Sequence, residues 1–249
     1  MNVKVEEGKM TDYKKDIEPN KLSNQKEFLK AAIGRKLLEV ERFFVLTPEE
    51  LLESCQRLNE KCDYSDYFSL NLGPTQFWFE GNFNQTFRFY SGGAPIIRFP
   101  GVYPDIDSRK KYQLSKMEHL TSSRLRNCLG QVCQDVRIWQ FSESQQTKRS
   151  LQKEKEGGWL TAEELEQDLK KLEEEIQRWG EEITDSGVSY LLSNGEEIIY
   201  CCNFYDSSLS NTLLFVEDLK PEYVYSCFSL GENNYTIQPK KFNFSYNQQ

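Results

Sequence analysis

The residue types that most often catalyse reactions near neutral pH are scarce in this chain. His119 is the only histidine, so a nucleophile activated by histidine would have to use it. It lies in the polar stretch SKMEHLTSSRLRNC, which is typical of a solvent-facing segment. The sequence therefore argues against catalysis by a Ser-His or Cys-His system.

Thiol chemistry is the other option, because the chain has seven cysteines. Cys128 and Cys133 lie in a basic stretch. Arg124 and Arg126 would stabilise a thiolate there, which makes a thiol-dependent transferase or lyase a third hypothesis. Buried, unreactive cysteine is the commoner arrangement, and the cysteine spacing has no matching pair for zinc. We expect no metal and no cofactor, and we lean towards a protein that is not an enzyme.

The side chains best suited to binding form the stretch QFWFEGNFNQTFRFYSGG, residues 76–93, with seven aromatic residues. Phenylalanine occupies only odd positions, whereas tryptophan, arginine and tyrosine occupy even positions. This alternation predicts a β-hairpin with one apolar face buried in the core. The other face is a candidate ligand surface. Its candidate ligand-binding residues, with one more from the following strand, are Trp78, Arg88, Tyr90 and Arg98.

Two turns set the expected strand pairing. A turn at 81–85 would place Phe79 opposite Phe87 and keep the phenylalanine rings on one face. Further along, Asn194-Gly195 in SYLLSNGEEIIYC favours a two-residue type I′ turn. Both segments are therefore predicted to be antiparallel hairpins.

Three segments carry helical patterns. Between 23 and 44 the apolar residues form the wide stripe of a core-packed helix, although Gly34 within it costs roughly 1 kcal/mol relative to alanine. The sequence LTPEEL predicts a capping box at the start of a second helix, over 47–59. The sequence LTAEEL does the same for a third helix, over 162–179.

The third helix has two features suited to binding a protein. Its apolar residues follow 4-3-4-3 spacing, which is the narrow seam of a coiled-coil-like contact. That seam docks either on the protein's own sheet or first helix, or on a partner. The seam residues are Leu165, Leu169, Leu172, Ile176 and Trp179. The candidate partner-binding carboxylates are Glu163, Glu166, Glu173 and Glu174.

These elements predict a β-rich α+β fold. Strands are expected in 76–141 and 187–246, with the third helix inserted between them. An antiparallel up-and-down barrel or strongly curved sheet of about nine or ten strands, with two N-terminal helices, is the simplest arrangement. We expect 1–20 to be a flexible charged tail and 21–249 to be a single α+β domain.

Charge and hydropathy limit the partners and the location. The net charge is -8, and although 86–150 holds eleven basic and five acidic residues, the acidic total argues against nucleic-acid binding. No apolar run is long enough to span a membrane, and the charged N-terminus has no signal-peptide pattern. An odd number of cysteines indicates free thiols. We therefore expect a cytoplasmic protein that does not bind a membrane.

Two function hypotheses follow. The first is a non-catalytic accessory protein whose β-barrel-like core binds a small aromatic or hydrophobic molecule. The alternative is a protein-interaction or assembly factor that uses the basic central stretch and the acidic helix.

Overall fold

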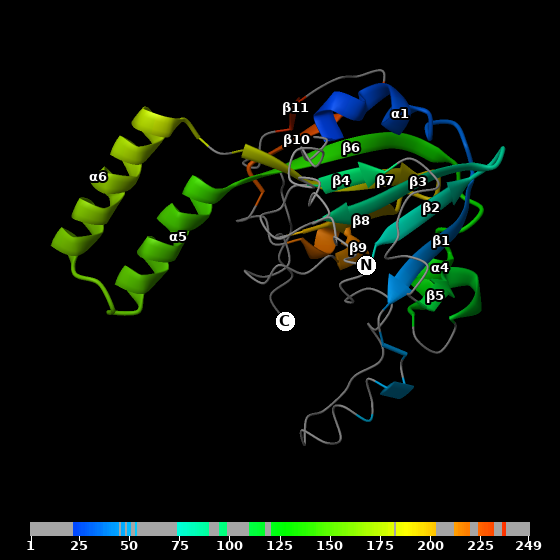
Figure 1. The fold of residues 1–249 in the computed structure, drawn as a ribbon, viewed down its shortest axis with the longest axis horizontal. Coiled ribbons are helices and arrows are strands. Elements are labelled where there is room, and N and C mark those ends of the chain that lie inside the picture. The colour runs from blue at the N-terminus through cyan, green and yellow to red at the C-terminus, as the bar shows by residue number, and fades with distance from the viewer. Residues whose placement is uncertain are drawn as a thin grey trace, which may run out of the picture.

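Two antiparallel sheets form the body of the protein (Figure 1). One has five strands and the other has six. The computed structural model describes residues 22–44, 46–47, 49–50, 53, 74–89, 95–98, 110–117, 121–181, 183–202, 212–219, 224–231 and 236–237.

The first sheet has the strand order β4-β3-β2-β1-β5, and all its neighbouring strands are antiparallel. Its strands are β1 (Leu37–Phe44), β2 (Thr75–Phe79), β3 (Phe83–Phe89), β4 (Pro95–Arg98) and β5 (Lys110–Gln113). Because β1 lies between β2 and β5, its backbone has hydrogen-bonding partners on both sides.

The second sheet has the order β11-β10-β6-β7-β8-β9, again with antiparallel neighbours. Its strands are β6 (Cys133–Ser142), β7 (Ile183–Leu192), β8 (Glu197–Cys201), β9 (Thr212–Phe215), β10 (Ser226–Ser229) and β11 (Thr236–Ile237). The long pair β6 and β7 forms the centre of this sheet.

Helices occupy the ends and edges of the sheets. The α-helices are α1 (Lys26–Lys30), α4 (Ser123–Arg126), α5 (Glu143–Glu156) and α6 (Ala162–Trp179). Short 3-10 turns are η1 (Leu22–Gln25), η2 (Leu114–Lys116) and η3 (Val216–Asp218). Of these helices only α5 and α6 are long, and Figure 1 shows that they point away from both sheets.

The two sheets meet at one corner. Lys36, just before β1, forms an antiparallel bridge with Val132, just before β6. Around it, Leu37 N donates to Gln131 O at 2.8 Å and Cys133 N donates to Arg35 O at 2.9 Å. This short junction fixes the position of one sheet relative to the other.

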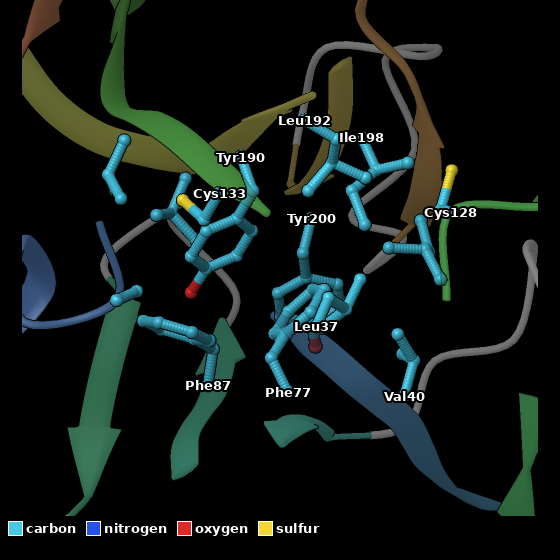
Figure 2. Close-up of a cluster of buried hydrophobic side chains, with 14 of the residues drawn as sticks. Leu37, Val40, Phe77, Phe87, Cys128, Cys133, Tyr190, Leu192, Ile198 and Tyr200 are labelled. Carbon is cyan, nitrogen blue, oxygen red and sulfur yellow. The ribbon is translucent and has the colours of Figure 1, made fainter. Parts of the chain in front are cut away.

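The core lies between the facing sides of the sheets (Figure 2). Phe77 from the first sheet and Tyr190 from the second are both fully buried, and their ring centroids are 4.7 Å apart. Phe87 and Tyr200 meet in the same way at 6.5 Å. Large aromatic rings from both sheets therefore fill the space between them.

The expected up-and-down barrel or single curved sheet is wrong. The eleven described strands form two sheets joined at a corner, and neither closes on itself. The physical reason is that the two sheets bury the apolar faces that they turn towards each other. The second sheet also buries an apolar cluster on its other face, which includes Trp139, Ile199 and Cys201.

The expected helix over 23–44, one of the two N-terminal helices, is also wrong. Helix α1 ends at Lys30, and the chain enters strand β1 at Leu37. Gly34 lies between them, after the turn that follows the helix, with φ +83°, a left-handed conformation, and its N–H donates to Cys133 O at 2.8 Å. Pairing of β1 with two neighbours then outweighs the helical spacing of its apolar residues.

The other two expected helices are described to different extents. Thr47 N donates to the Glu50 carboxylate at 2.6 Å, and Glu50 N donates to Thr47 Oγ1 at 3.1 Å, as expected for a capping box. Most of 47–59 lies outside the described residues, as does the expected tail, 1–20. Helix α6 spans the expected 162–179 in full.

Both hairpins form, but with different turns. In the first, Phe79 pairs with Phe83 rather than with Phe87, and the turn is 80–82. In the second, Leu192 N donates to Glu196 O at 2.8 Å, so the turn is 193–195 rather than a type I′ pair. Each three-residue turn uses a left-handed glycine, a common hairpin form.

Candidate functional site

A helical hairpin interrupts the central strand pair of the second sheet. Strands β6 and β7 pair along their length, and Ser142 lies opposite Ile183. A two-residue turn would suffice at that point. Instead 143–182 intervenes, and α5 and α6 form a projecting hairpin that we call the helical arm (Figure 1). A long insertion that adds no strand to the sheet is a candidate for function.

Polar contacts hold the base of the helical arm. Ser142 caps α5, because its Oγ accepts a hydrogen bond from Gln145 N at 3.2 Å. Ser142 Oγ and Ser144 Oγ each donate to Glu181 Oε1 at 2.8 Å. Since Glu181 follows α6 and the serines begin α5, these bonds tie the two ends of the arm together.

The ends of α6 are sharply defined. Thr161 Oγ1 accepts from Glu164 N at 3.2 Å, while Thr161 N donates to Glu164 Oε2 at 2.9 Å. The hydrogen bond from Thr161 N–H lowers the pKa of Glu164. At the other end Gly180, with φ +83°, donates its N–H to Ile176 O at 2.8 Å. These caps define a helix of eighteen residues.

The tip of the arm presents an exposed indole. The side chain of Trp159 is 83% exposed, yet its backbone N–H donates to Glu154 O at 2.8 Å. Its ring lies close against Gly157, where a Cβ atom would come within 2.8 Å of Trp159 Cδ1. Backbone bonds from Gly157 and Gly158 to α5 carbonyls complete the turn. The indole is therefore held in place although water surrounds it.

The apolar seam of α6 is only partly covered. Leu165 is 9% exposed and Trp179 is 77% exposed. The three seam residues between them, Leu169, Leu172 and Ile176, are half-buried. In the predicted site, docking of this seam on the protein's own sheet or first helix was one option. Among the described residues α6 packs beside α5 (Figure 1), and its seam residues before Trp179 are less exposed than most of the helix.

The four predicted partner-binding carboxylates all lie on α6 and are exposed. Glu173 forms a salt bridge of 3.9 Å with Lys148 of α5. Within the described residues, no salt bridge engages Glu163, Glu166 or Glu174. An exposed ion pair typically contributes less than about 1 kcal/mol to the free energy of unfolding. The acidic residues of α6 therefore contribute little to the stability of the arm.

The predicted ligand-binding residues are not gathered at one point. Trp78 lies on the outer face of the first sheet, opposite Asn84 of β3. Arg88 lies four residues further along β3, about 13 Å away at the usual strand rise. Arg98 pairs with Thr86 on the neighbouring strand β4. The side chains of Arg88 and Arg98, and Tyr90 as a whole, lie outside the described residues.

Trp78 belongs to a polar cluster that the sequence did not indicate. Its Nε1 donates to Glu41 Oε2 at 2.9 Å, and Gln113 Nε2 donates to Glu41 Oε1 at 2.8 Å. Lys111 Nζ lies 3.1 Å from the same carboxylate. Burial raises the pKa of Glu41, but the three donors outweigh it and leave the pKa below its ordinary value. Glu41 was missed because β1 was expected to be a helix.

A second buried polar cluster crosses the outer face of the second sheet. Arg137 Nε lies 3.2 Å from Asp135 Oδ2, and Arg137 Nη1 lies 2.8 Å from Glu197 Oε2. Ser189 Oγ donates to Glu197 at 2.5 Å and accepts from Trp139 Nε1 at 2.7 Å. Burial raises the pKa of Glu197. Alternating polar residues in QDVRIWQ are the sequence signal for this face.

That cluster stabilises the pairing of strands. Asp135 also accepts from Ser229 Oγ and Gly231 N, both at 2.9 Å. The network therefore runs from β10 through β6 and β7 to β8. A network with hydrogen bonds at every acidic group is typical of a structural role.

The cysteines that the structure describes do not form a nucleophilic site. All five described cysteines are free and buried. Burial raises the pKa of Cys128 and of Cys133 to about 12, so both are protonated at neutral pH. Arg124 is engaged by Glu196 and Glu217 rather than by a thiolate. The geometry thus removes the observation that motivated a thiol enzyme.

Two features are absent from the described part of the chain. No helix there is long and apolar enough to cross a membrane. No group of three or more histidine, cysteine, aspartate or glutamate side chains there has metal-binding geometry.

Comparisons with known proteins do not assign a family. The chain matches no protein-family model, no curated protein and no solved structure. Fold and site by themselves define the class: an α+β protein of two packed antiparallel sheets that carries a projecting helical arm.

Proposed function

We propose that this chain is a non-catalytic protein-interaction factor that binds a protein partner through its helical arm. The observation that carries the proposal is the insertion of two long helices where a short turn would join β6 to β7. Neither helix belongs to the core between the sheets. An element that the fold does not need for its core is best explained by a contact outside the molecule.

The surface of the arm supports this proposal. Trp179 is 77% exposed although tryptophan is the residue most enriched at the energetic centre of interfaces. The seam beside it is half-buried, so a partner can still remove apolar surface from water. The caps of α6 make the arm a pre-ordered element, which lowers the entropy lost on binding.

The binding of a small molecule is less well supported. Its candidate residues were Trp78, Arg88, Tyr90 and Arg98, and the space between the sheets is packed with side chains instead of forming a lumen. The Trp78 indole N–H already has a partner in Glu41. A ligand would therefore have to bind on the outer face of the first sheet.

The proposed location is the cytoplasm. Five buried cysteines are present as free thiols. Proteins of reducing compartments keep their cysteines in this form.

Deletion of the arm tests the proposal. In this variant an Asn-Gly turn replaces 143–182 and joins the paired residues Ser142 and Ile183. Tagged wild-type and deleted chains are purified gently from cells of the source organism and analysed by native mass spectrometry. We expect a protein complex with the wild type and a bare chain with the deletion, while circular dichroism shows that the sheets remain.

A matched variant controls for exposed apolar surface elsewhere. Leu38 of β1 is 51% exposed and lies outside the arm. Leu38→Ala should keep the complex. A complex of the same mass with the deleted chain would refute the proposed function.

A further inference from the structure

The seam of α6 lacks an apolar counterpart in α5. Helix α5 has the sequence ESQQTKRSLQKEKE, in which Leu151 is the only apolar residue. Its partly buried positions include Lys148 and Arg149, and Lys148 pairs with Glu173 of α6. The seam of α6 thus has five apolar residues, whereas α5 has one. The arm resembles a coiled coil that lacks one helix.

The heptad positions of α6 describe the missing helix. With Leu165, Leu172 and Trp179 at d, the a positions are Leu169 and Ile176. The e and g positions, which flank such a seam and select partners, are then all acidic. They are Glu166 and Glu173 at e, and Asp168 and Glu175 at g.

Two of these flanking carboxylates already form salt bridges within the arm. Asp168 pairs with Lys171 at 2.8 Å, and Glu173 pairs with Lys148 at 3.9 Å. In the described chain, neither Glu166 nor Glu175 has a salt bridge. Both can therefore form salt bridges with lysine or arginine side chains of another helix.

This charge pattern also argues against a second copy of the chain. Two α6 helices packed seam to seam would bring acidic e and g positions together, and like charges there are unfavourable. A basic helix would instead gain complementary pairs along the whole seam. Its matching length is that of α6, eighteen residues or about 27 Å.

We propose that the helical arm binds a basic amphipathic helix of a partner protein, which packs its apolar face on the α6 seam and completes a three-helix coiled coil. This inference rests on the proposed function and names the chemistry of the partner. The partner helix has leucine or isoleucine in heptad spacing and lysine or arginine beside them.

A synthetic helix provides the test with the full chain. The probe is a fluorescein-labelled peptide of about three heptads, with Ile at a, Leu at d and Lys at e and g, and the matched peptide has Glu at e and g. Fluorescence anisotropy measures binding in about 50 mM and about 500 mM NaCl. We expect the lysine peptide to bind at least about tenfold more tightly than the glutamate peptide, with a smaller difference at high salt.

Charge variants of α6 show whether the seam is the binding surface. Glu166→Gln with Glu175→Gln should weaken binding about fivefold at low salt, since two exposed pairs of roughly 0.5 kcal/mol each are lost. Glu154→Gln with Glu156→Gln changes the net charge equally, but at exposed positions of α5 outside the seam. That control should change affinity less than about twofold.

Tryptophan variants provide a second matched pair. Trp179→Ala removes a seam residue and should weaken binding at least about fivefold, and because the side chain is 77% exposed the fold is not at risk. Trp159→Ala removes an equally exposed indole at the tip, outside the seam, and should have less than a twofold effect.

The outcomes separate this inference from the proposed function. The coiled-coil inference is overturned if the lysine peptide does not bind, or if both pairs of charge substitutions weaken its binding equally. This holds even if deletion of the arm abolishes the native complex. A native complex that survives deletion overturns both.

Discussion

At the scale of single residues, the two predicted sites differ in whether a local sequence pattern can indicate the contacts of their residues. The carboxylates on α6 were expected on an exposed helix surface, and local periodicity is enough to predict that. Trp78 was expected at a binding face of a strand. It lies on the outer face of the first sheet, and its partner Glu41 comes from a strand 37 residues away in the sequence. No local pattern indicates such a contact.

The cluster around Glu41 gives a pH-dependent prediction. The folded-state pKa of Glu41 is lowered, so its ionised form stabilises the fold at neutral pH and this stabilisation is lost as the pH falls through the folded-state pKa. Glu41→Gln should lower the free energy of unfolding by about 1 to 3 kcal/mol at pH 7. The difference from wild type should shrink below about pH 4.

Urea denaturation at several pH values, monitored by circular dichroism, measures this effect. Glu80, at the turn between β2 and β3, is an exposed control. Glu80→Gln should change the stability by less than about 0.5 kcal/mol. A Glu41→Gln difference that stays constant from pH 3 to pH 7 would contradict the role of its ionised form.

At the scale of elements, Gly34 lies where the chain passes from the turn after α1 into strand β1. Gly34 has φ +83°, and a Cβ atom there would have no neighbour within 4 Å. Its substitution therefore tests backbone conformation without a steric clash. We expect Gly34→Ala to lower the free energy of unfolding by about 1 to 2 kcal/mol, because an L-residue is strained in this region.

Gly180 is the matched control for this prediction. It has the same φ of +83° and equally open surroundings, but it ends α6 in the helical arm. Gly180→Ala should reduce the stability of the arm while thermal unfolding of the sheets changes little. Equal effects of both substitutions on the unfolding of the sheets would show that the arm is part of the cooperative core.

At the scale of the whole molecule, two buried clusters enclose the described thiols: Cys128, Cys133 and Cys202 lie between the sheets, and Cys201 and Cys227 lie in the cluster on the other face of the second sheet. The five described cysteines are buried, and burial raises the pKa of Cys201 and Cys227 as well as those of Cys128 and Cys133. A buried, protonated thiol reacts slowly. These five should therefore stay unmodified by iodoacetamide in the native protein and react when it is unfolded in guanidinium chloride.

Mass-spectrometric peptide mapping before and after unfolding identifies the modified cysteines. Fast alkylation of Cys128 or Cys133 in the native state would contradict the burial described above and revive the hypothesis of a thiol enzyme. The unfolded protein is the internal control, since every cysteine is then accessible.

The sequence by itself determined the features that depend on neighbouring residues. The capping box, length and seam of α6 follow from contacts within about four residues, and the inward face of the β2–β3 hairpin follows from alternation. Tertiary structure decided the rest. The turn at Gly34 and pairing with two neighbouring strands made β1 a strand. Both hairpins formed three-residue turns instead of the expected ones.

The pairing of distant strands, and the burial of two apolar faces on each other, produced two sheets instead of a barrel. The same alternating pattern suits a sandwich and a barrel, because it specifies which side chains point inward but not which strands meet. It also could not show that α6 leaves the sheets and packs on a helix almost without apolar residues. That arrangement leaves the seam half-open, which is why the arm is the proposed binding site.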